Sequence, residues 1–219
     1  MPDTLHSAGL SMSDLQTAWE QDYRNRGRLW GGSPVLLPGI APGIRVLDIG
    51  CGDGKTLEAL VHHSHDITAI DFSKEAVAMS HRFLASYDSG HALVADGRRL
   101  PFADDAFGGI IARHVIGHQY REGRMAIASE AARVLQPCGR LFFFEFSADD
   151  MRNGTGREVE EYTYRRGTGI ITHYFTEPEV EALFCELKKE SISTRSWKMR
   201  VKGRELFRAE IVAVFSKSC

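Results

Sequence analysis

Short apolar runs alternate with helical segments along the middle of the chain, and this alternation constrains the fold more than any other feature. Each run has the length of a buried strand, and the segments between the runs have helical periodicity. Strands that alternate with helices at this spacing form βαβ units, in which the strands run parallel. The expected strands are residues 45–49, 67–71, 92–96, 107–112 and 140–146, and the expected helices are 55–63, 74–87 and 121–135.

The C-terminal part of the chain predicts a different connection. A helix over 177–187, capped by Thr176, precedes two strands at 190–201 and 206–216 that are joined through 202–204. A turn this short joins only antiparallel strands. We therefore predict an α/β fold, with a Rossmann-like, doubly wound and mostly parallel seven-stranded sheet that ends in an antiparallel C-terminal hairpin.

The richest motif is the glycine loop over residues 46–56, which lies between the first expected strand and the first expected helix. A phosphate-binding P-loop is excluded because its first glycine would fall on Ile49. The dinucleotide fingerprint fits poorly because its third glycine would fall on Lys55. A third pattern, D-x-G-x-G-x-G, is filled completely from Asp48 to Gly54.

This loop resembles the first motif of class I S-adenosylmethionine (SAM)-dependent methyltransferases, and the chain is most similar to their small "type 11" domains. Further motifs follow in the family's order. Asp71 closes the second strand, residues 96–107 resemble a D-x-x-x-L-P-F-x-D-x-x-F stretch, and residues 134–139 resemble an L-x-P-G-G turn with Cys138 in place of one glycine. The resemblance covers residues 43–146.

The resemblance implies SAM as the cofactor and assigns roles to particular residues. Asp48 orients the methionine amino group, the loop glycines shape the turn, and Asp71 accepts hydrogen bonds from the ribose hydroxyls, as a carboxylate is able to do. An acidic residue at position 96 meets the adenine amino group. Leu100 and Phe102 either form an apolar wall beside the adenine or pack in the core. The expected cofactor-binding residues are Asp48, Gly50, Cys51, Gly52, Gly54, Asp71, Phe72, Asp96, Gly97, Arg98, Arg113 and, from a glycine-flanked loop position, Trp30.

Methyl transfer from a sulfonium requires no fixed catalytic motif, because the cofactor carries the reactive group. The candidate general bases are His114, His118 and His173, with His114 and His118 favoured because they follow the fourth strand; a structural role is the alternative for each. The His114-x-x-x-His118 spacing resembles half of a metal site, but no carboxylate or cysteine stands at a matching offset, so no metal is expected.

We expect one domain over 1–219, with 1–42 as an N-terminal cap and 147–170 as an insertion, and both as the substrate lid of such enzymes. No secretion signal or membrane-spanning segment is recognised. The four cysteines form no C-x-x-C pair, which predicts unpaired thiols and a cytoplasmic protein.

Charge patterning leaves the acceptor open. The net charge is −2, yet residues 188–208 hold eight Lys and Arg against two Glu. The first hypothesis is a methyltransferase with a small-molecule substrate. The alternatives are a tRNA-modifying methyltransferase that contacts phosphates through this basic hairpin, or a SAM-binding regulatory or partner-binding protein without turnover. The pattern predicts no particular oligomeric state.

Overall fold

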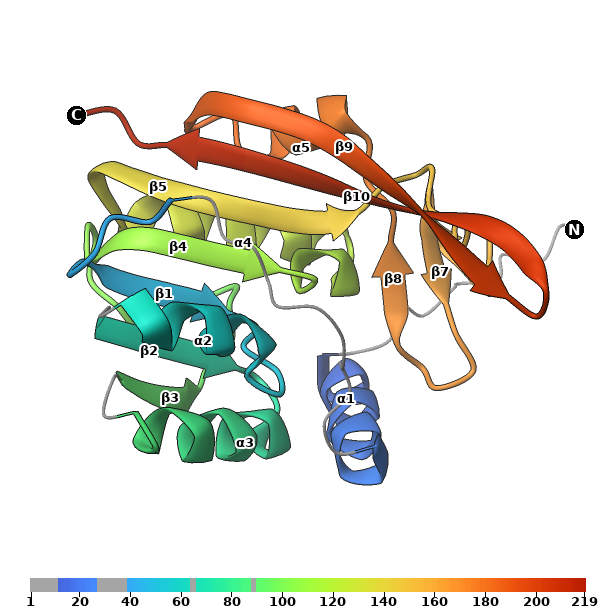
Figure 1. Ribbon diagram of the computed structural model, residues 1–219, viewed down its shortest axis with the longest axis horizontal. Helices are drawn as coiled ribbons and strands as arrows, with labels where there is room; N and C mark the ends of the chain where they lie inside the picture. Colours follow the sequence, from blue (N-terminus) through green and yellow to red (C-terminus); the bar gives the residue numbers. More distant parts are fainter. Residues whose placement is uncertain (1–11, 27–38, 64–65, 88–89) are drawn as a thin grey trace, which may run out of the picture.

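A computed structural model describes residues 12–26, 39–63, 66–87 and 90–219. Its main element is a seven-stranded sheet with the strand order β3-β2-β1-β4-β5-β10-β9 (Figure 1). The first five strands along the chain run parallel to one another, and β10 pairs antiparallel with both β5 and β9. The strands are β1 (Arg45–Ile49), β2 (Asp66–Asp71), β3 (Gly90–Val94), β4 (Phe107–Arg113), β5 (Leu135–Phe146), β9 (Lys188–Val201) and β10 (Arg204–Ser216).

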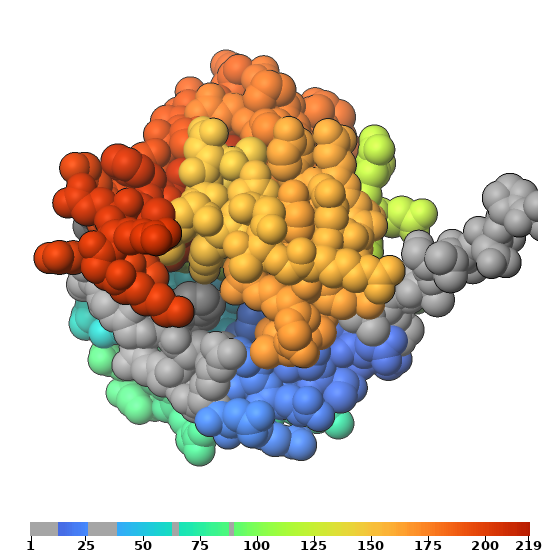
Figure 2. Space-filling model, turned by 90° about the vertical axis from the view of Figure 1, so that its right-hand side faces the viewer, coloured from blue at the N-terminus to red at the C-terminus, as the bar shows by residue number. Residues whose placement is uncertain are grey.

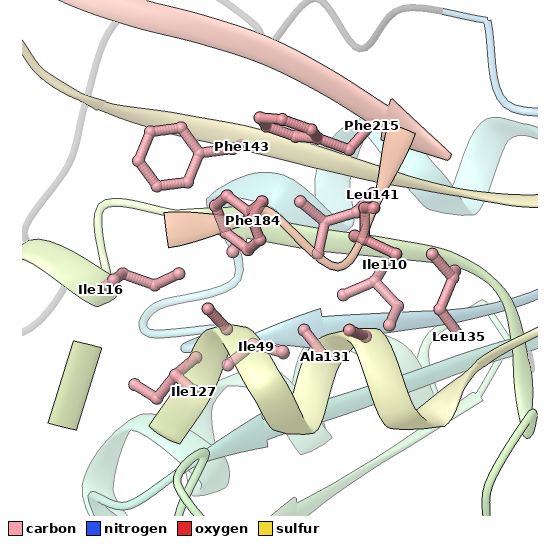
Figure 3. Close-up of a cluster of buried hydrophobic side chains, with 14 of the residues drawn as sticks. Ile49, Ile110, Ile116, Ile127, Ala131, Leu135, Leu141, Phe143, Phe184 and Phe215 are labelled. Carbon is pink, nitrogen blue, oxygen red and sulfur yellow. The ribbon is translucent and has the colours of Figure 1, made fainter. Parts of the chain in front are cut away.

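Helices cover both faces of this sheet, as a doubly wound fold requires. One core cluster joins the sheet to α4 and α5 through side chains such as Ile127, Val180 and Phe184 (Figure 3). The cluster on the other face includes Leu57 of α2 and Leu84 of α3. The predicted fold is therefore confirmed. The helical elements are α1 (Met12–Arg26), α2 (Lys55–Leu60), η1 (Val61–His63), α3 (Lys74–Ala85), η2 (Ile116–His118), α4 (Arg121–Val134) and α5 (Glu177–Leu183).

The strand order reverses between β1 and β4. The chain runs outward from β1 to β2 and β3, and then returns to place β4 on the other side of β1. In open α/β sheets, the connections beyond the carboxyl ends of the strands diverge at such a point and leave a crevice. The loops that follow β1 and β4 therefore border the expected ligand site.

A second, three-stranded antiparallel sheet begins within the expected insertion 147–170 and ends just beyond it. It consists of β6 (Arg157–Glu160), β7 (Thr163–Arg165) and β8 (Ile171–His173). These strands are three or four residues long and largely polar, so they carry no periodicity that predicts a strand. None of the described helices combines the length and the apolar character needed to cross a bilayer.

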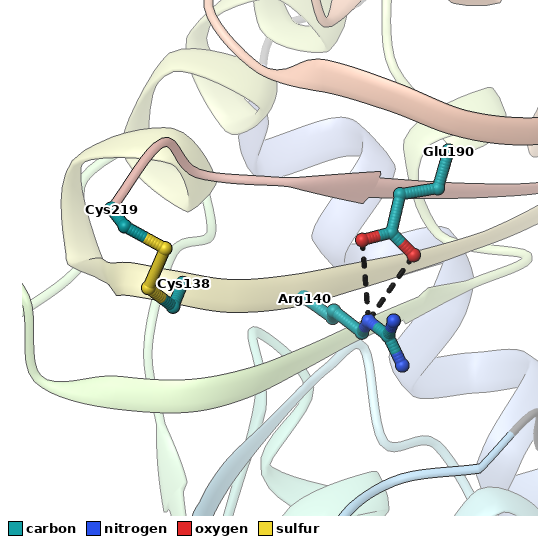
Figure 4. The surroundings of a disulfide bond; sticks show 4 residues. All are labelled: Cys138, Arg140, Glu190 and Cys219. Atoms are coloured by element: carbon teal, nitrogen blue, oxygen red, sulfur yellow. Dashed lines mark hydrogen bonds and ion pairs between the residues drawn. A yellow bond between two sulfur atoms is a disulfide. The ribbon is translucent and has the colours of Figure 1, made fainter.

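The expectation of four unpaired cysteines is wrong, because Cys138 and Cys219 form a disulfide (Figure 4). The two cysteines are 81 residues apart, and only the antiparallel pairing of β10 with β5 brings them together. The predicted turn at 137–139 is also an irregular part of β5, where Cys138 has a φ of 61°. The backbone amide of Cys138 donates to the carbonyl of Lys217, which helps hold this left-handed conformation. The disulfide removes the cysteine argument for a reducing compartment, so the cytoplasmic location stays a prediction.

We predict that Cys219→Ser lowers the free energy of unfolding by about 3–4 kcal/mol, because the bond closes a long loop in the unfolded chain. Urea unfolding without reductant measures the change. Cys185→Ser, at an exposed free cysteine, is the control and should unfold like the wild type. Equal stability of the Cys219 variant and the wild type would contradict the assigned bond.

Candidate cofactor and acceptor site

The glycine loop after β1 turns back over the end of β2. Gly50, Gly52 and Gly54 all have positive φ values, of 75°, 53° and 87°, which explains why this loop needs glycine. The amides of Gly50 and Cys51 both donate to the carbonyl of Ile70, at 2.8 and 2.9 Å. A Cβ added at Gly52 would also lie 2.8 Å from the Tyr23 hydroxyl, so the loop is closely covered.

Asp71 ties this loop to the start of α3. One oxygen of its carboxylate accepts the amide of Gly52 at 3.1 Å, and the other accepts the amide of Ser73 at 2.9 Å. Burial raises the pKa of Asp71 to about 6, although these hydrogen bonds oppose the shift. Each carboxylate oxygen has two lone pairs, so both retain capacity for a ribose hydroxyl.

Asp48 is the most unusual polar residue near the glycine loop. Its side chain is 1% exposed, and neither carboxylate oxygen has a hydrogen-bond partner among the described residues. Burial raises the pKa of Asp48 to about 8, and the nearby Asp71 adds to the shift while Arg113 opposes it. A buried carboxyl without a partner is costly and suits a cationic ligand group, which fits the role that the family gives this residue.

Two adjoining hollows form one cleft at the carboxyl edge of β1 and β4. The first is lined by the residues expected around adenosine, including Asp71, Phe72, Asp96 and Gly97. The second contains the loop residues Cys51 and Gly52, together with Arg113. The two hollows share Trp19, Tyr23, Gly50, His114 and His118.

Helix α1 covers this cleft and is fixed to the body of the protein. Gln16 donates to the carbonyl of Phe72 at 2.7 Å, and the Glu20 carboxylate accepts the amide of Lys74 at the start of α3 at 2.7 Å. These contacts place Trp19 and Tyr23 in a cluster that also contains Ile170, from the turn between β7 and β8. Figure 2 views this end of the molecule, where α1, the small sheet and the β9–β10 hairpin gather.

The two favoured histidines differ in their surroundings. His118 Nδ1 lies 2.7 Å from the carbonyl of Ile171, so this nitrogen carries the proton and Nε2 keeps its lone pair. Burial lowers the pKa of His118, which keeps it neutral near pH 7. His114 instead stacks on Phe146, and its Nε2 lies 3.0 Å from a carboxylate oxygen of Glu210.

Several expected residues take other roles. His173 lies between Thr163, at 2.8 Å, and Glu179, also at 2.8 Å, outside the cleft, so a structural role fits it. Leu100 and Phe102 do not line the cleft; Leu100 belongs to the core, and Phe102 packs against that core. Of the two roles expected for Leu100 and Phe102, core packing is therefore correct and the wall is not. Ile49, Ile70 and Ile127 line that hollow instead.

Asp96 and Gly97 line the cleft, but Arg98 does not, and neither does the buried Asp48. The guanidinium of Arg98 folds back on the Asp96 carboxylate, with contacts from 2.7 Å. Partial burial raises the pKa of Asp96, but these hydrogen bonds outweigh it and the net shift is downward. Gly54 is the N-cap residue of α2 and does not line the cleft. Trp30 lies outside the described residues.

Sequence reasoning missed the acidic and aromatic residues at the exit of β5 and on β10. Glu145 is 1% exposed and accepts the amide of Gly117 at 2.8 Å, below the loop that carries His118. Glu210 pairs with His114 and, at 3.3 Å, with Arg113. Their signal was present in the sequence, because each is a charged residue inside an apolar strand. No group of three metal-ligating side chains occurs among the described residues.

Comparisons with known proteins agree with this geometry. The sequence model of the family described as "Methyltransferase domain" matches residues 47–143. A demethylmenaquinone methyltransferase of Parafrankia sp. is 32% identical over 199 residues, covering 83% of this chain and 75% of the relative. A tRNA N(3)-cytidine methyltransferase of Danio rerio is 28% identical, covering 71% of this chain and 48% of the relative. The chain thus spans about half the length of the tRNA-modifying relatives it matches.

Solved structures show the same fold at lower identity. A SAM-dependent methyltransferase of Methanosarcina mazei has a TM-score of 0.68 and 24% identity, covering 82% of this chain and 94% of that one. A 1,6-didemethyltoxoflavin-N1-methyltransferase of Burkholderia thailandensis, solved with S-adenosylhomocysteine, has a TM-score of 0.63 and 18% identity, covering 94% and 79%.

The chain belongs to the class I SAM-dependent methyltransferases, an enzyme family whose cofactor is SAM. Within that class it carries the small methyltransferase domain that the sequence motifs indicate.

We predict that SAM binding at pH 7 releases about one proton from Asp48, because its carboxyl is protonated when free and ionised beside an ammonium group. Asp71, with a pKa of about 6, contributes little at this pH. Calorimetry in buffers of different ionisation enthalpy measures the number released. Asp48→Asn should abolish the release; a heat of binding that is independent of buffer in the wild type would contradict the assignment.

Proposed function

We propose that the protein transfers the methyl group of SAM to a small-molecule acceptor in the cleft between β1 and β4. The observation that carries this proposal is the unpartnered, buried carboxyl of Asp48 beneath a glycine loop at the point where the strand order reverses. The relatives named demethylmenaquinone methyltransferase support a small acceptor. The cover of the cleft by α1 also supports a small acceptor.

The site residues divide into those that hold the cofactor and those that face the acceptor. Bound SAM supplies an electrophilic methyl group on a sulfonium, so the protein mainly orients a nucleophile and excludes water. In this proposal Asp48 binds the ammonium group and Asp71 the ribose hydroxyls. Asp96 and Gly97 lie at the adenine end, and Arg113 lies near the acceptor.

The lid in this proposal consists of α1, within the cap 1–42, and of the small sheet that the insertion 147–170 begins, within the single domain 1–219. The two parts meet through the cluster that contains Trp19 and Ile170. Because both lie over the carboxyl edge of the sheet, they exclude water from the cofactor. Neither part contributes to the seven-stranded sheet, so both are free to differ with the acceptor.

His118 is the proposed general base, and His114 the residue that shapes the cleft beside it. A neutral imidazole with a free Nε2 is able to take the proton of an attacking hydroxyl or amine. His114 suits that role less, because its ring already pairs with Glu210 and stacks on Phe146. The carboxylate of Glu145, below η2, helps hold the loop that carries His118.

A tRNA acceptor is the second candidate, favoured by the basic hairpin and by the tRNA-modifying relatives. Exposed Trp197 and Phe207 on that hairpin are suited to base stacking. Transfer to tRNA that falls steeply with salt would support it over a small acceptor. SAM binding without turnover on any substrate would instead support the regulatory role.

We predict that His118→Asn lowers kcat by about 10²–10⁴-fold for acceptors that must lose a proton, with little change in SAM affinity. Turnover is measured as the S-adenosylhomocysteine formed from SAM when phenols, carboxylates, amines and thiols are offered as acceptors. Wild-type activity should fall only at a pH below the ordinary titration range of histidine, because burial lowers the pKa of His118. Unchanged kcat and pH profile in the variant would exclude His118 as the base.

A further inference from the structure

The hairpin of β9 and β10 extends well beyond the sheet, and its outer part is here called the arm (residues 196–208). The pairing of β10 with β5 ends at Glu210 and Phe146, whereas the pairing of β10 with β9 continues to Arg204 and Val201. Figure 1 shows the two strands continuing past the end of β5. The arm is therefore a two-stranded ribbon that continues beyond the end of β5 and has two opposite faces.

The register decides which side chains share a face. Trp197 lies opposite Arg208, and Met199 lies opposite Leu206. Directly opposed residues of antiparallel strands point to the same side, and side chains alternate along each strand. Trp197, Met199, Leu206 and Arg208 therefore share one face, while Phe207 lies on the other.

The face with Trp197 is continuous with the cleft. Trp197, Arg208 and Glu210 line the hollow that also contains the glycine loop, His114 and His118. Beyond them, the same face continues through Met199 and Leu206 to Val201, about 13 Å along β9 from Trp197. The cleft is thus continuous with an apolar strip on this face of the arm.

The side chains of this strip are unusually exposed for their type. Trp197 and Met199 are each 43% exposed, and Leu206 is 37% exposed. Large apolar side chains gathered on one exposed face mark a binding surface more often than scattered ones do. Arg208 fixes the inner end of the strip, because its guanidinium lies 5.6 Å from the Trp197 ring centre and bonds Asp150 at 2.6 Å.

We propose that the cleft-side face of the arm is the subsite for an apolar extension of the acceptor. Such an acceptor is elongated, with its nucleophile beside His118 and an alkyl or aromatic portion along Trp197, Met199 and Leu206. This inference rests on the proposed function and names its substrate class. The continuity of the strip with the cleft favours one extended small molecule over a macromolecule that would contact both faces of the arm.

The test is a series of 4-alkylphenols, from 4-methylphenol to 4-octylphenol, titrated into the SAM-saturated protein by calorimetry. Full burial of a methylene group raises affinity about fourfold. Because the strip contacts an alkyl chain on one side only, we expect half of that free energy, which is about a twofold rise in affinity per methylene. The double variant Met199→Ser/Leu206→Ser should lose this dependence on chain length. Its affinities for 4-methylphenol and for SAM should match the wild type, which also shows that it is folded.

Phe207→Ser is the matched control, because Phe207 is 52% exposed on the opposite face of the same arm. It should retain the full dependence on chain length. Equal dependence in the wild type and the double variant would overturn the subsite. Equal loss in the double variant and the Phe207 variant would overturn it too and point to a membrane or RNA surface formed by both faces, which anionic vesicles and bulk tRNA then distinguish.

The same titrations keep the two proposals apart. Chain-length dependence without methyl transfer to any phenol, amine or thiol would leave the subsite standing and remove the proposed function. Methyl transfer without that dependence would remove the subsite alone.

Discussion

The hydrogen bonds that the Asp71 carboxylate accepts from Gly52 and Ser73 are the interaction on which the site depends. They hold the glycine loop over the end of β2 and orient the start of α3 at the same time. Helix α1 then adds its own bonds to the start of α3, through Glu20. The loop, the second strand and the cap thus share one anchor, and the cleft takes its shape from it.

A second constraint is the burial of charge. The carboxyl of Asp48 is kept neutral by burial and lacks a partner among the described residues. His114 and Arg113, by contrast, both pair with Glu210. In our proposal, the free protein therefore has a favourable place for an added cation at the cofactor end, and a wall of paired charges at the acceptor end. This asymmetry is what a site needs when its cofactor is constant and its acceptor varies between relatives.

The sequence predicted the features that repeat along the chain and missed those created by distant contacts. Strand and helix periods, the D-x-G-x-G-x-G loop and the short connection at 202–204 are local patterns, and they were sufficient for the seven-stranded fold. The bond between Cys138 and Cys219 depends on the register of β10 against β5, which no local pattern contains. The wall role given to Leu100 and Phe102 failed because an apolar residue beside a cleft and one in the core look alike in sequence. The roles of the individual site residues stay predictions.

Calorimetric titration of the wild-type protein with SAM and S-adenosylhomocysteine, with NAD and ATP as controls, tests the cofactor assignment most directly. We expect micromolar binding of the first two and no binding of the controls, because the loop fits neither the dinucleotide nor the P-loop pattern. Binding of NAD in place of SAM, or binding of none of the four, would contradict it.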